Sequence, residues 1–189
     1  MATEVAVLDS CVLYSASLRD FFLSLADADM FQPKWSAEIH EEWIEALLAN
    51  RIDLKRRDLE LTRDQMDRYF SEAVVLGSEI LIPTLTLPDP GDRHVLAAAV
   101  HSQADTIVTA NLKDFPPAAL APYGIGARGP DDFANHLLNR DENEALSALA
   151  KMRTRLKNPA MTPKEFVDSI GRAGLKTTAA RLRLHIARL

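Results

Sequence analysis

The chain has 189 residues, of which 47% are hydrophobic and 26% are charged, and its formal net charge is −5. This composition excludes a disordered chain, and the longest apolar run, residues 95–100, is far too short to cross a membrane. The single cysteine, Cys11, excludes an internal disulfide and a cysteine-rich metal site. The first ten residues lack the basic region of a signal peptide, so we expect a soluble, cytoplasmic protein.

Basic residues are concentrated at the end of the chain. Residues 150–189 carry ten Lys and Arg against two acids, a net charge of +8. Residues 1–149 carry 12 basic and 25 acidic residues, a net charge of −13. This asymmetry predicts an acidic body with a basic tail, which could bind nucleic acid, an acidic partner or the body itself.

The first half of the chain alternates strand-like and helix-like segments. The apolar run at 5–8 is typical of a strand buried on both faces of a parallel sheet. Apolar positions at helical spacing predict a helix over 11–25. Ser36 is expected to cap a helix over 37–49.

The same alternation continues through the middle of the chain. The pattern Thr62-x-x-Gln65 resembles a capping box that would open a helix over 63–76. Residues 79–82 are a candidate strand, 93–103 form a predicted helix of small residues, and 106–109 are a second buried strand. Strands and helices in this order predict an α/β fold with a mainly parallel sheet.

Past a last predicted strand at 125–128, the pattern becomes helical. Residues 141–157 have acids in the first turn and bases in the last, which matches a helix dipole. Thr162, Pro163 and Glu165 together are a strong helix-start signal. Gly171 and Gly174 are expected to close that helix, and residues 176–188 to form a basic final one.

Polar side chains follow both predicted buried strands. Asp9 comes directly after the first strand, and Asn111 and Asp114 follow the second. Because ligands of open α/β sheets bind at the carboxyl ends of the strands, we expect these groups to lie at one site. A simple alternative for Asp9 is an N-cap of the following helix.

Two helices add further acidic candidates. Asp92 opens the 93–103 helix on the same stripe as its apolar residues, where a carboxylate needs a partner that a cation would supply, although it could simply cap the helix. On the 37–49 helix, Glu41 and Glu42 border opposite edges of the apolar face, whereas Glu38 and Glu45 point to water. Periodicity does not choose between Glu41 and Glu42.

The sequence resembles the PIN-domain nucleases, which include the VapC-type toxins of toxin–antitoxin pairs. The resemblance is carried by VAVLDSCVLYSA at 5–16, WSAEIHEEWIEALL at 35–48 and, most specifically, 87–116. In this last stretch an Asp opens an Ala-rich helix, and an apolar strand and T-x-N-x-x-D-F-P follow. The resemblance implies a three-layer α/β/α PIN domain over 1–135, and the rest, 136–189, would be a basic helical C-terminal extension.

The resemblance also implies a set of site residues. Matched to the family pattern, the catalytic and metal-binding acids would be Asp9, Glu42, Asp92 and Asp114. Asn111 stands where many members have Asp, so it competes with Asp114 as the fourth ligand, and Cys11 replaces a small polar residue. The hydroxyl group of Thr109 would steady the site.

Carboxylates of this kind hold Mg²⁺, or alternatively Mn²⁺, and the ion activates water for attack at phosphorus. The resemblance implies hydrolysis of RNA to a 3′-hydroxyl and a 5′-phosphate, a homodimer, and inhibition by a cognate antitoxin. Of the three possible contacts of the basic tail, we favour RNA, because the acidic body needs positive charge nearby to attract a polyanion. Two alternatives stay open: an RNA-processing PIN nuclease without an antitoxin, and a catalytically weak RNA-binding protein.

Three other patterns carry less weight. G-x-G-x-x-G at 124–129 matches a dinucleotide motif but comes too late in the chain, so we favour a strand there. His94 and His101 lack a metalloprotease pattern and are expected to have scaffold or surface roles. The basic cluster at 51–57 is either a solvated face or part of an RNA groove.

Overall fold

The computed structural model describes residues 3–157 and 159–189. The chain forms two compact units. The sheet unit comprises residues 4–14 and 32–128, and the helical unit consists mainly of residues 15–31 and 129–189. No helix in the described residues is long and apolar enough to span a bilayer. The predicted domain boundary at residue 135 stays a prediction, because the compact units are built from interleaved segments.

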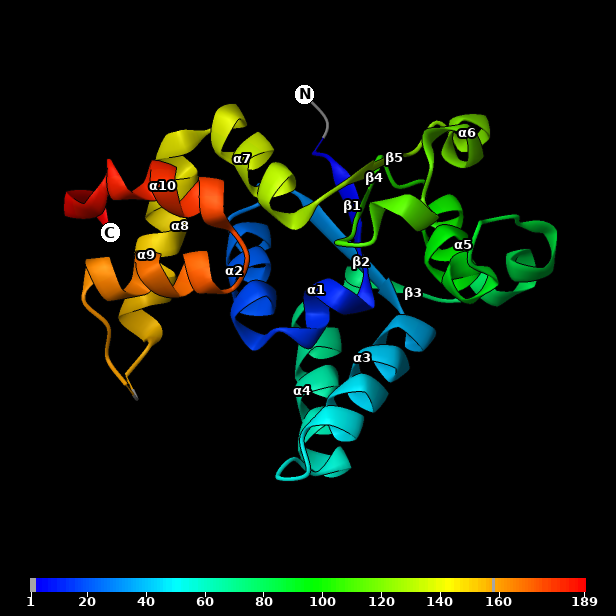
Figure 1. Ribbon diagram of the computed structural model, residues 1–189, viewed down its shortest axis with the longest axis horizontal. Coiled ribbons are helices and arrows are strands. Elements are labelled where there is room, and N and C mark those ends of the chain that lie inside the picture. Colours follow the sequence, from blue (N-terminus) through cyan, green and yellow to red (C-terminus); the bar gives the residue numbers. More distant parts are fainter. Residues whose placement is uncertain (1–2, 158) are drawn as a thin grey trace. The chain divides into compact units, whose positions relative to one another are not determined.

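The sheet unit is built on five parallel strands in the order β3-β2-β1-β4-β5 (Figure 1). Their bounds are Val5–Leu8 (β1), Gln32–Ser36 (β2), Val74–Val75 (β3), Thr106–Val108 (β4) and Gly126–Arg128 (β5). In the central strand β1, Val7 lies opposite Lys34 on one side and Ile107 on the other. Val7 is fully buried, as expected of a strand covered on both faces.

Helices flank this sheet, which confirms the predicted three-layer α/β/α arrangement. The α-helices of the sheet unit are α1 (Ser10–Tyr14), α3 (Ala37–Asn50), α4 (Arg56–Tyr69), α5 (Arg93–His101) and α6 (Pro117–Leu120). Short 3₁₀ segments connect them: η1 (Ser71–Ala73), η2 (Ser78–Thr84), η3 (Pro90–Asp92), η4 (Leu112–Asp114) and η5 (Ala121–Tyr123). Helix α5 packs on β1, β2 and β4, and α1 packs on α3.

The helical unit contains α2 (Ala16–Ala26), α7 (Pro130–Arg140), α8 (Glu142–Arg155), α9 (Pro163–Arg172), α10 (Lys176–Arg183) and η6 (Ile186–Arg188). Aromatic packing explains why residues 15–31 belong to it. The ring of Phe133 in α7 lies 5.9 Å from that of Phe22 and 5.2 Å from that of Phe31. The predicted helices over 141–157 and from Thr162 are confirmed, including the capping box between Thr162 and Glu165.

Several predicted boundaries are wrong. The helix expected over 11–25 is two helices, because the Ser15 hydroxyl group caps α2 by accepting from the Leu18 N–H. The helix expected over 63–76 is α4, which begins seven residues earlier; Thr62 lies inside it and donates to the Asp58 carbonyl. Residues 79–82 are 3₁₀ helix rather than strand, and β2 was not predicted at all.

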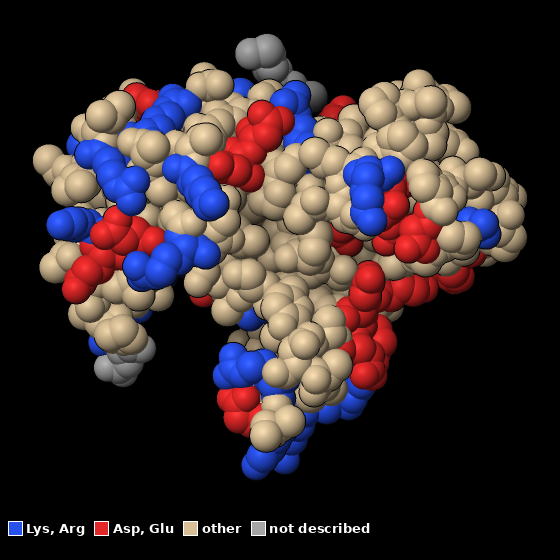
Figure 2. Space-filling view, in the orientation of Figure 1, with Lys and Arg blue, Asp and Glu red and all other residues tan. Residues whose placement is uncertain are grey.

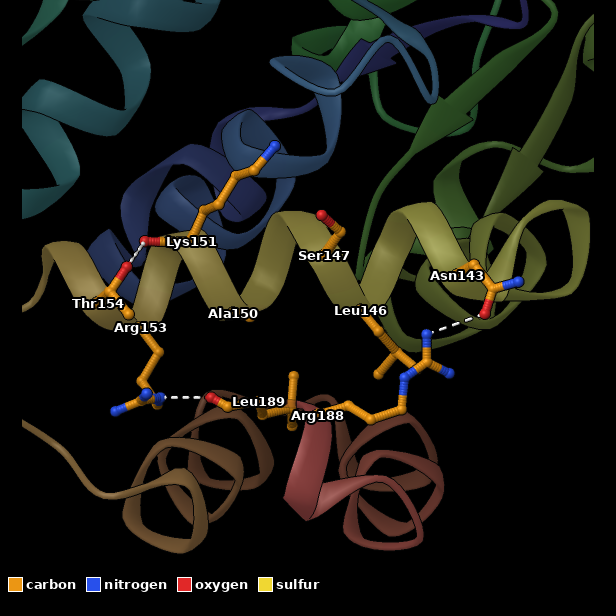
Figure 3. Close-up of a pocket in the computed structure, with 9 residues that line it drawn as sticks. All are labelled: Asn143, Leu146, Ser147, Ala150, Lys151, Arg153, Thr154, Arg188 and Leu189. Atoms are coloured by element: carbon orange, nitrogen blue, oxygen red, sulfur yellow. Dashed lines mark hydrogen bonds between the residues drawn. The ribbon is translucent and has the colours of Figure 1, made fainter.

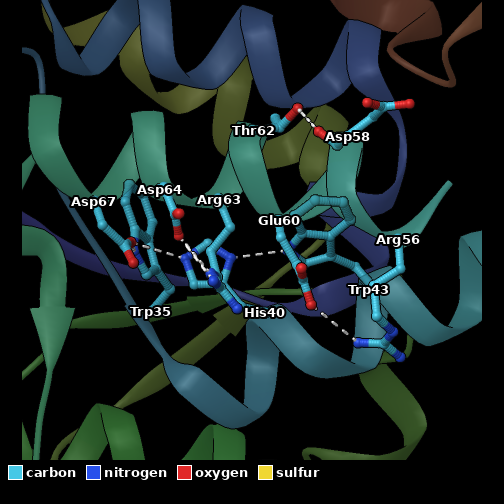
Figure 4. A network of polar contacts seen from close by, with 10 residues as sticks. All are labelled: Trp35, His40, Trp43, Arg56, Asp58, Glu60, Thr62, Arg63, Asp64 and Asp67. Atoms are coloured by element: carbon cyan, nitrogen blue, oxygen red, sulfur yellow. Dashed lines mark hydrogen bonds and ion pairs between the residues drawn. The ribbon is translucent and has the colours of Figure 1, made fainter.

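A partly buried polar network joins β2 and α3 to α4 and so orients α3, the helix that carries Glu42 (Figure 4). The Trp35 indole donates to Asp67 Oδ1 at 2.8 Å, and His40 Nε2 lies 3.0 Å from the same oxygen. The Trp43 indole donates to His40 Nδ1 at 2.9 Å. Because an indole only donates, Nδ1 of His40 accepts and Nε2 carries the proton toward Asp67.

Candidate functional site

Asp9 lies where the carboxyl ends of β1 and β4 meet, since its N–H donates to the Val108 carbonyl at 3.1 Å. The side chain is only 5% exposed. Its Oδ2 accepts from the Thr109 hydroxyl at 2.6 Å and from the Cys11 thiol at 3.2 Å. Burial and the Asp9 charge raise the pKa of Cys11 to about 12, so Cys11 keeps its proton and orients the carboxylate.

Asp114 lies next to this strand end, at the end of η4, and is 9% exposed. The side-chain amide of Asn111 donates to Asp114 Oδ2, and the Asn111 N–H donates to the Thr109 hydroxyl at 3.0 Å. Asn111 therefore orients the Asp114 carboxylate, and Thr109 links the Asp114 loop to Asp9. These contacts give Asn111 and Thr109 supporting positions around two acids.

A carboxylate that the sequence reasoning missed belongs to the same cluster. One carboxylate oxygen each of Asp89, Asp92 and Asp114 lies within 4.8 Å of the others, close enough to hold a metal ion. Asp89 Oδ1 accepts from the Gly91 N–H at 2.7 Å, which closes the η3 turn and brings Asp89 beside Asp92. The spacing D-P-G-D was the available signal, because one tight turn places its first and last residues together.

The Asp92 carboxyl group is the least satisfied member of the cluster. Burial and the charges of Asp9, Asp89, Asp114 and Glu42 raise its pKa to about 6. Its Oδ2 is buried without a hydrogen-bond partner among the described residues, and its side chain caps no N–H of α5. A buried carboxylate oxygen surrounded by negative charge fits a cation, so the residues present suit a hard divalent metal ion.

Glu42 is held at the edge of this cluster by His94. His94 Nε2 lies 3.1 Å from Glu42 Oε2, and Nδ1 lies 2.7 Å from the Gly91 carbonyl oxygen. The hydrogen bond with His94 lowers the pKa of Glu42. Burial lowers the pKa of His94, but its contacts with Glu42 and Gly91 raise it by more, so the pKa lies above its usual value.

The structure also distinguishes the two glutamates that periodicity left open. Glu41 is paired with Arg56 of α4 at 2.8 Å. Glu42 lies on the side of α3 that contacts His94, and its charge contributes to the raised pKa of Asp92. The other three predicted acids, Asp9, Glu42 and Asp114, therefore lie close enough to Asp92 for their charges to raise its pKa. His94, expected to have a scaffold or surface role, contacts Glu42.

Comparisons with known proteins agree with this geometry. The family model of the PIN domain matches residues 5–113, more than half of the chain, and a model described as the VapC50 C-terminal domain matches residues 130–184. "Putative ribonuclease VapC50" of Mycobacterium tuberculosis strain H37Rv is 45% identical over 80 residues, which are 42% of this chain and 47% of that protein. The chain thus spans about half the length of this curated relative, and no solved structure matches it. The resemblance noted in the sequence is confirmed: the chain belongs to the PIN-domain family.

Proposed function

We propose that this chain is a metal-dependent endoribonuclease and the toxin of a type II toxin–antitoxin pair. The observation that carries the nuclease assignment is the unpartnered buried oxygen of Asp92 among four other acids, at the carboxyl edge of a PIN-family sheet. The similarity to a protein named as a ribonuclease supports RNA as the substrate. The match of residues 130–184 to a VapC-type domain supports the toxin role.

The proposed ligands of the metal are carboxylates. They are Asp9, Glu42, Asp92 and Asp114, with Asp89 added from the structure. An all-oxygen set favours Mg²⁺, with Mn²⁺ as the alternative. A divalent ion held there would supply water activation near neutral pH and neutralise charge at the phosphate.

The chain's own residues prepare the site before substrate arrives. Thr109 fixes Asp9, Asn111 fixes Asp114 and His94 fixes Glu42, so each of these carboxylates has a polar neighbour that sets its orientation. Preorganised charges need no rearrangement during the reaction, which is how such groups lower a barrier. Among the acids in the described residues, only Asp92 keeps a buried oxygen without a hydrogen-bond partner, and we assign this oxygen to the metal.

The nuclease proposal is tested by incubating purified protein with total cellular RNA and Mg²⁺, Mn²⁺ or EDTA. We expect discrete metal-dependent cuts with 5′-phosphate ends, and at least a thousandfold loss of activity in Asp92→Asn. The exposed Asp53, whose carboxylate pairs with Arg51 and with none of the five acids, provides the control Asp53→Asn, which should keep full activity. RNA cleavage that persists in Asp92→Asn would contradict the assignment of the site. A wild-type protein that binds RNA but does not cleave it would contradict the assignment of nuclease activity.

The toxin proposal needs a separate test in cells. We expect the wild-type chain to arrest growth when it is expressed alone, and the Asp92→Asn variant to leave growth unchanged. Co-expression with a small reading frame adjacent to its gene should restore growth and yield a copurifying complex, in which we propose a homodimer of this chain. RNA cleavage without growth arrest would favour an RNA-processing PIN nuclease.

A further inference from the structure

Helices α9 and α10 form a tight hairpin in the helical unit. Residues 173–175 make the turn, in which Gly174 adopts a φ of +107° that a residue with a side chain rarely adopts. A Cβ on Gly171 would lie 3.3 Å from the Ala179 Cβ, so the two helices pack closely there. Between them lies a cavity of about 520 Å³, the α9–α10 groove, lined by Asp168, Gly171, Arg172, Lys176, Ala179 and Arg183.

The groove is positively charged because few acids neutralise its cations. Arg172 and Lys176 are exposed and make no hydrogen bond or ion pair with any residue in the described part of the chain. Arg183 donates to Asp168 at 2.8 Å, which leaves the groove with three cations and one acid. The other acid of α9, Glu165, accepts from the Thr162 N–H at 2.9 Å in the capping box.

Other cations of the helical unit serve internal contacts instead. Around the cavity of about 440 Å³ beside α8, Arg153 donates to the Leu189 carbonyl at 2.6 Å and Arg188 donates to Asn143 at 2.9 Å (Figure 3). Arg181 of α10 is similarly bound by Glu142 at 2.6 Å. These arginines hold helices together, whereas Arg172 and Lys176 are exposed, and Arg172 acts on the nearby Asp168 only through its charge.

The sheet unit has the opposite charge. It carries 17 acidic and 10 basic residues, a net charge of −7, whereas the helical unit has a net charge of +2. Figure 2 shows Lys and Arg side chains over α9 and α10 with a few acidic side chains among them, and acidic side chains along α3. An acidic catalytic unit repels a polyanion, so its substrate needs a cationic surface elsewhere on the chain.

We infer that the α9–α10 groove binds the phosphate backbone of the RNA substrate, with Arg172 and Lys176 as the principal phosphate contacts. The inference rests on the proposed ribonuclease function and adds a substrate-binding surface outside the sheet unit. Unpaired exposed cations in a concave site are suited to phosphate oxygens, which accept hydrogen bonds from both Arg and Lys. Such contacts are independent of base sequence and are weakened by salt.

The direct test measures RNA binding without cleavage. The probe is a fluorescein-labelled 20-nucleotide single-stranded RNA of mixed sequence, titrated in EDTA across a range of salt concentrations. For Arg172→Gln/Lys176→Gln we expect roughly tenfold weaker binding at low salt and a salt slope smaller by about 1.4, since each lost phosphate contact removes about 0.7. The control Arg68→Gln/Lys151→Gln removes the same two charges at exposed positions outside the groove and should bind within twofold of wild type.

A kinetic readout with Mg²⁺ separates this inference from the proposed function. We expect the groove variant to raise KM about tenfold with a much smaller change in kcat, at an unchanged melting temperature. RNA binding in EDTA that depends on the groove, without any cleavage by the wild type, would support the groove and contradict the nuclease. The groove assignment would be overturned if both double variants lost RNA affinity equally or if neither lost any. It would also be overturned if the protein bound poly-glutamate more tightly than RNA.

Discussion

The Asp92 carboxyl group raises the free energy of the folded chain in two ways. One oxygen is buried without a partner among the described residues, and four other acids oppose its charge. An unsatisfied buried polar group costs about 1–3 kcal/mol, and such costs are tolerated at functional sites. A cation would remove both costs together, so metal binding and stability should be coupled at this residue.

We therefore expect Asp92→Asn to stabilise the metal-free protein at pH 7.5 by about 1 kcal/mol, after allowance for screening by solvent. The raised pKa of about 6 means that the folded state binds more protons than the unfolded state between about pH 4 and pH 6. The wild type therefore loses stability as pH rises from about 4 to about 6. The stability of Asp92→Asn relative to the wild type should increase over this range and stay constant at higher pH.

Thermal unfolding in EDTA at pH 4.5 and 7.5, repeated with Mg²⁺, checks this expectation. Mg²⁺ should raise the melting temperature of the wild type and leave that of Asp92→Asn nearly unchanged. A variant less stable than the wild type at pH 7.5, or stabilised equally by Mg²⁺, would remove Asp92 from the metal site.

Thr109 gives a second prediction at the residue scale. Thr109→Val keeps the shape of the side chain but removes the hydroxyl that donates to Asp9 at 2.6 Å. We expect Mn²⁺ affinity to fall by about 10–100-fold, because residues that orient metal ligands have effects of this size. Thr106, the first residue of β4, donates to Glu4 at 2.8 Å, so Thr106→Val is a control that should keep its Mn²⁺ affinity. Calorimetric titration with Mn²⁺ measures the affinity of both variants. Equal affinities would show that the Thr109 hydroxyl does not orient a metal ligand.

At the scale of elements, local sequence patterns predicted the ends of some helices and misplaced others. Ser36 and Thr162 cap the helices they were expected to cap. Around Thr62 the local pattern was misleading, because Leu59 and Met66 are buried at helical spacing on both sides of it and the helix continues through. Ile80 is 71% exposed, which a buried strand would not allow. Tertiary packing decided these cases.

The polar network between α3 and α4 supplies an element-scale prediction. Asp67→Leu leaves the Trp35 indole and the His40 imidazole without their acceptor, so we expect a loss of about 2–4 kcal/mol. Asp64 on the same helix pairs with Arg63 at the surface, and Asp64→Leu should cost less than about 1 kcal/mol. Urea unfolding of both variants measures the difference, and equal losses would show that the network adds little.

Helix α10 begins without a capping side chain of its own, and Asp131 of α7 takes that place. Its carboxylate accepts from the N–H groups of Thr177 at 2.8 Å and Thr178 at 2.9 Å. We expect Asp131→Ala to cost about 1–2 kcal/mol, as removal of an N-cap does. The exposed Glu144 offers a control, and Glu144→Ala should be nearly neutral.

The same contact predicts a pH dependence. Burial raises the pKa of Asp131, but the hydrogen bonds from Thr177 and Thr178 lower it by more, so the pKa of the folded state lies below its usual value. The stabilisation is therefore complete above about pH 4 and is lost as pH falls through the lower native pKa. Unfolding at pH 7 and pH 3 should show a smaller effect of Asp131→Ala at pH 3, and an equal effect would exclude the ionised cap.

At the scale of the molecule, the sequence predicted strands β1, β4 and β5 of the sheet, but neither β2 nor β3, nor how segments group in space. When the sequence is divided after residue 149, the first part has a net charge of −13 and the second part a net charge of +8. The compact units differ from these parts: the sheet unit has a net charge of −7 and the helical unit a net charge of +2. The difference arises because residues 15–31 and the acidic starts of α7 and α8 join the basic helices. No local pattern reveals the packing of Phe22 on Phe133, whereas acids after strands are visible from sequence order alone.

That aromatic packing has a consequence for synthesis on the ribosome. Phe22 emerges 111 residues before Phe133, the ring on which it packs. At ordinary rates of translation this interval is on the order of ten seconds. Throughout it, the apolar face of α2 lacks its partner and is open to chaperones or to other nascent chains. Chaperones that bind exposed apolar segments would therefore meet this chain early, and a fragment ending at residue 128 should aggregate instead of folding as a shorter protein.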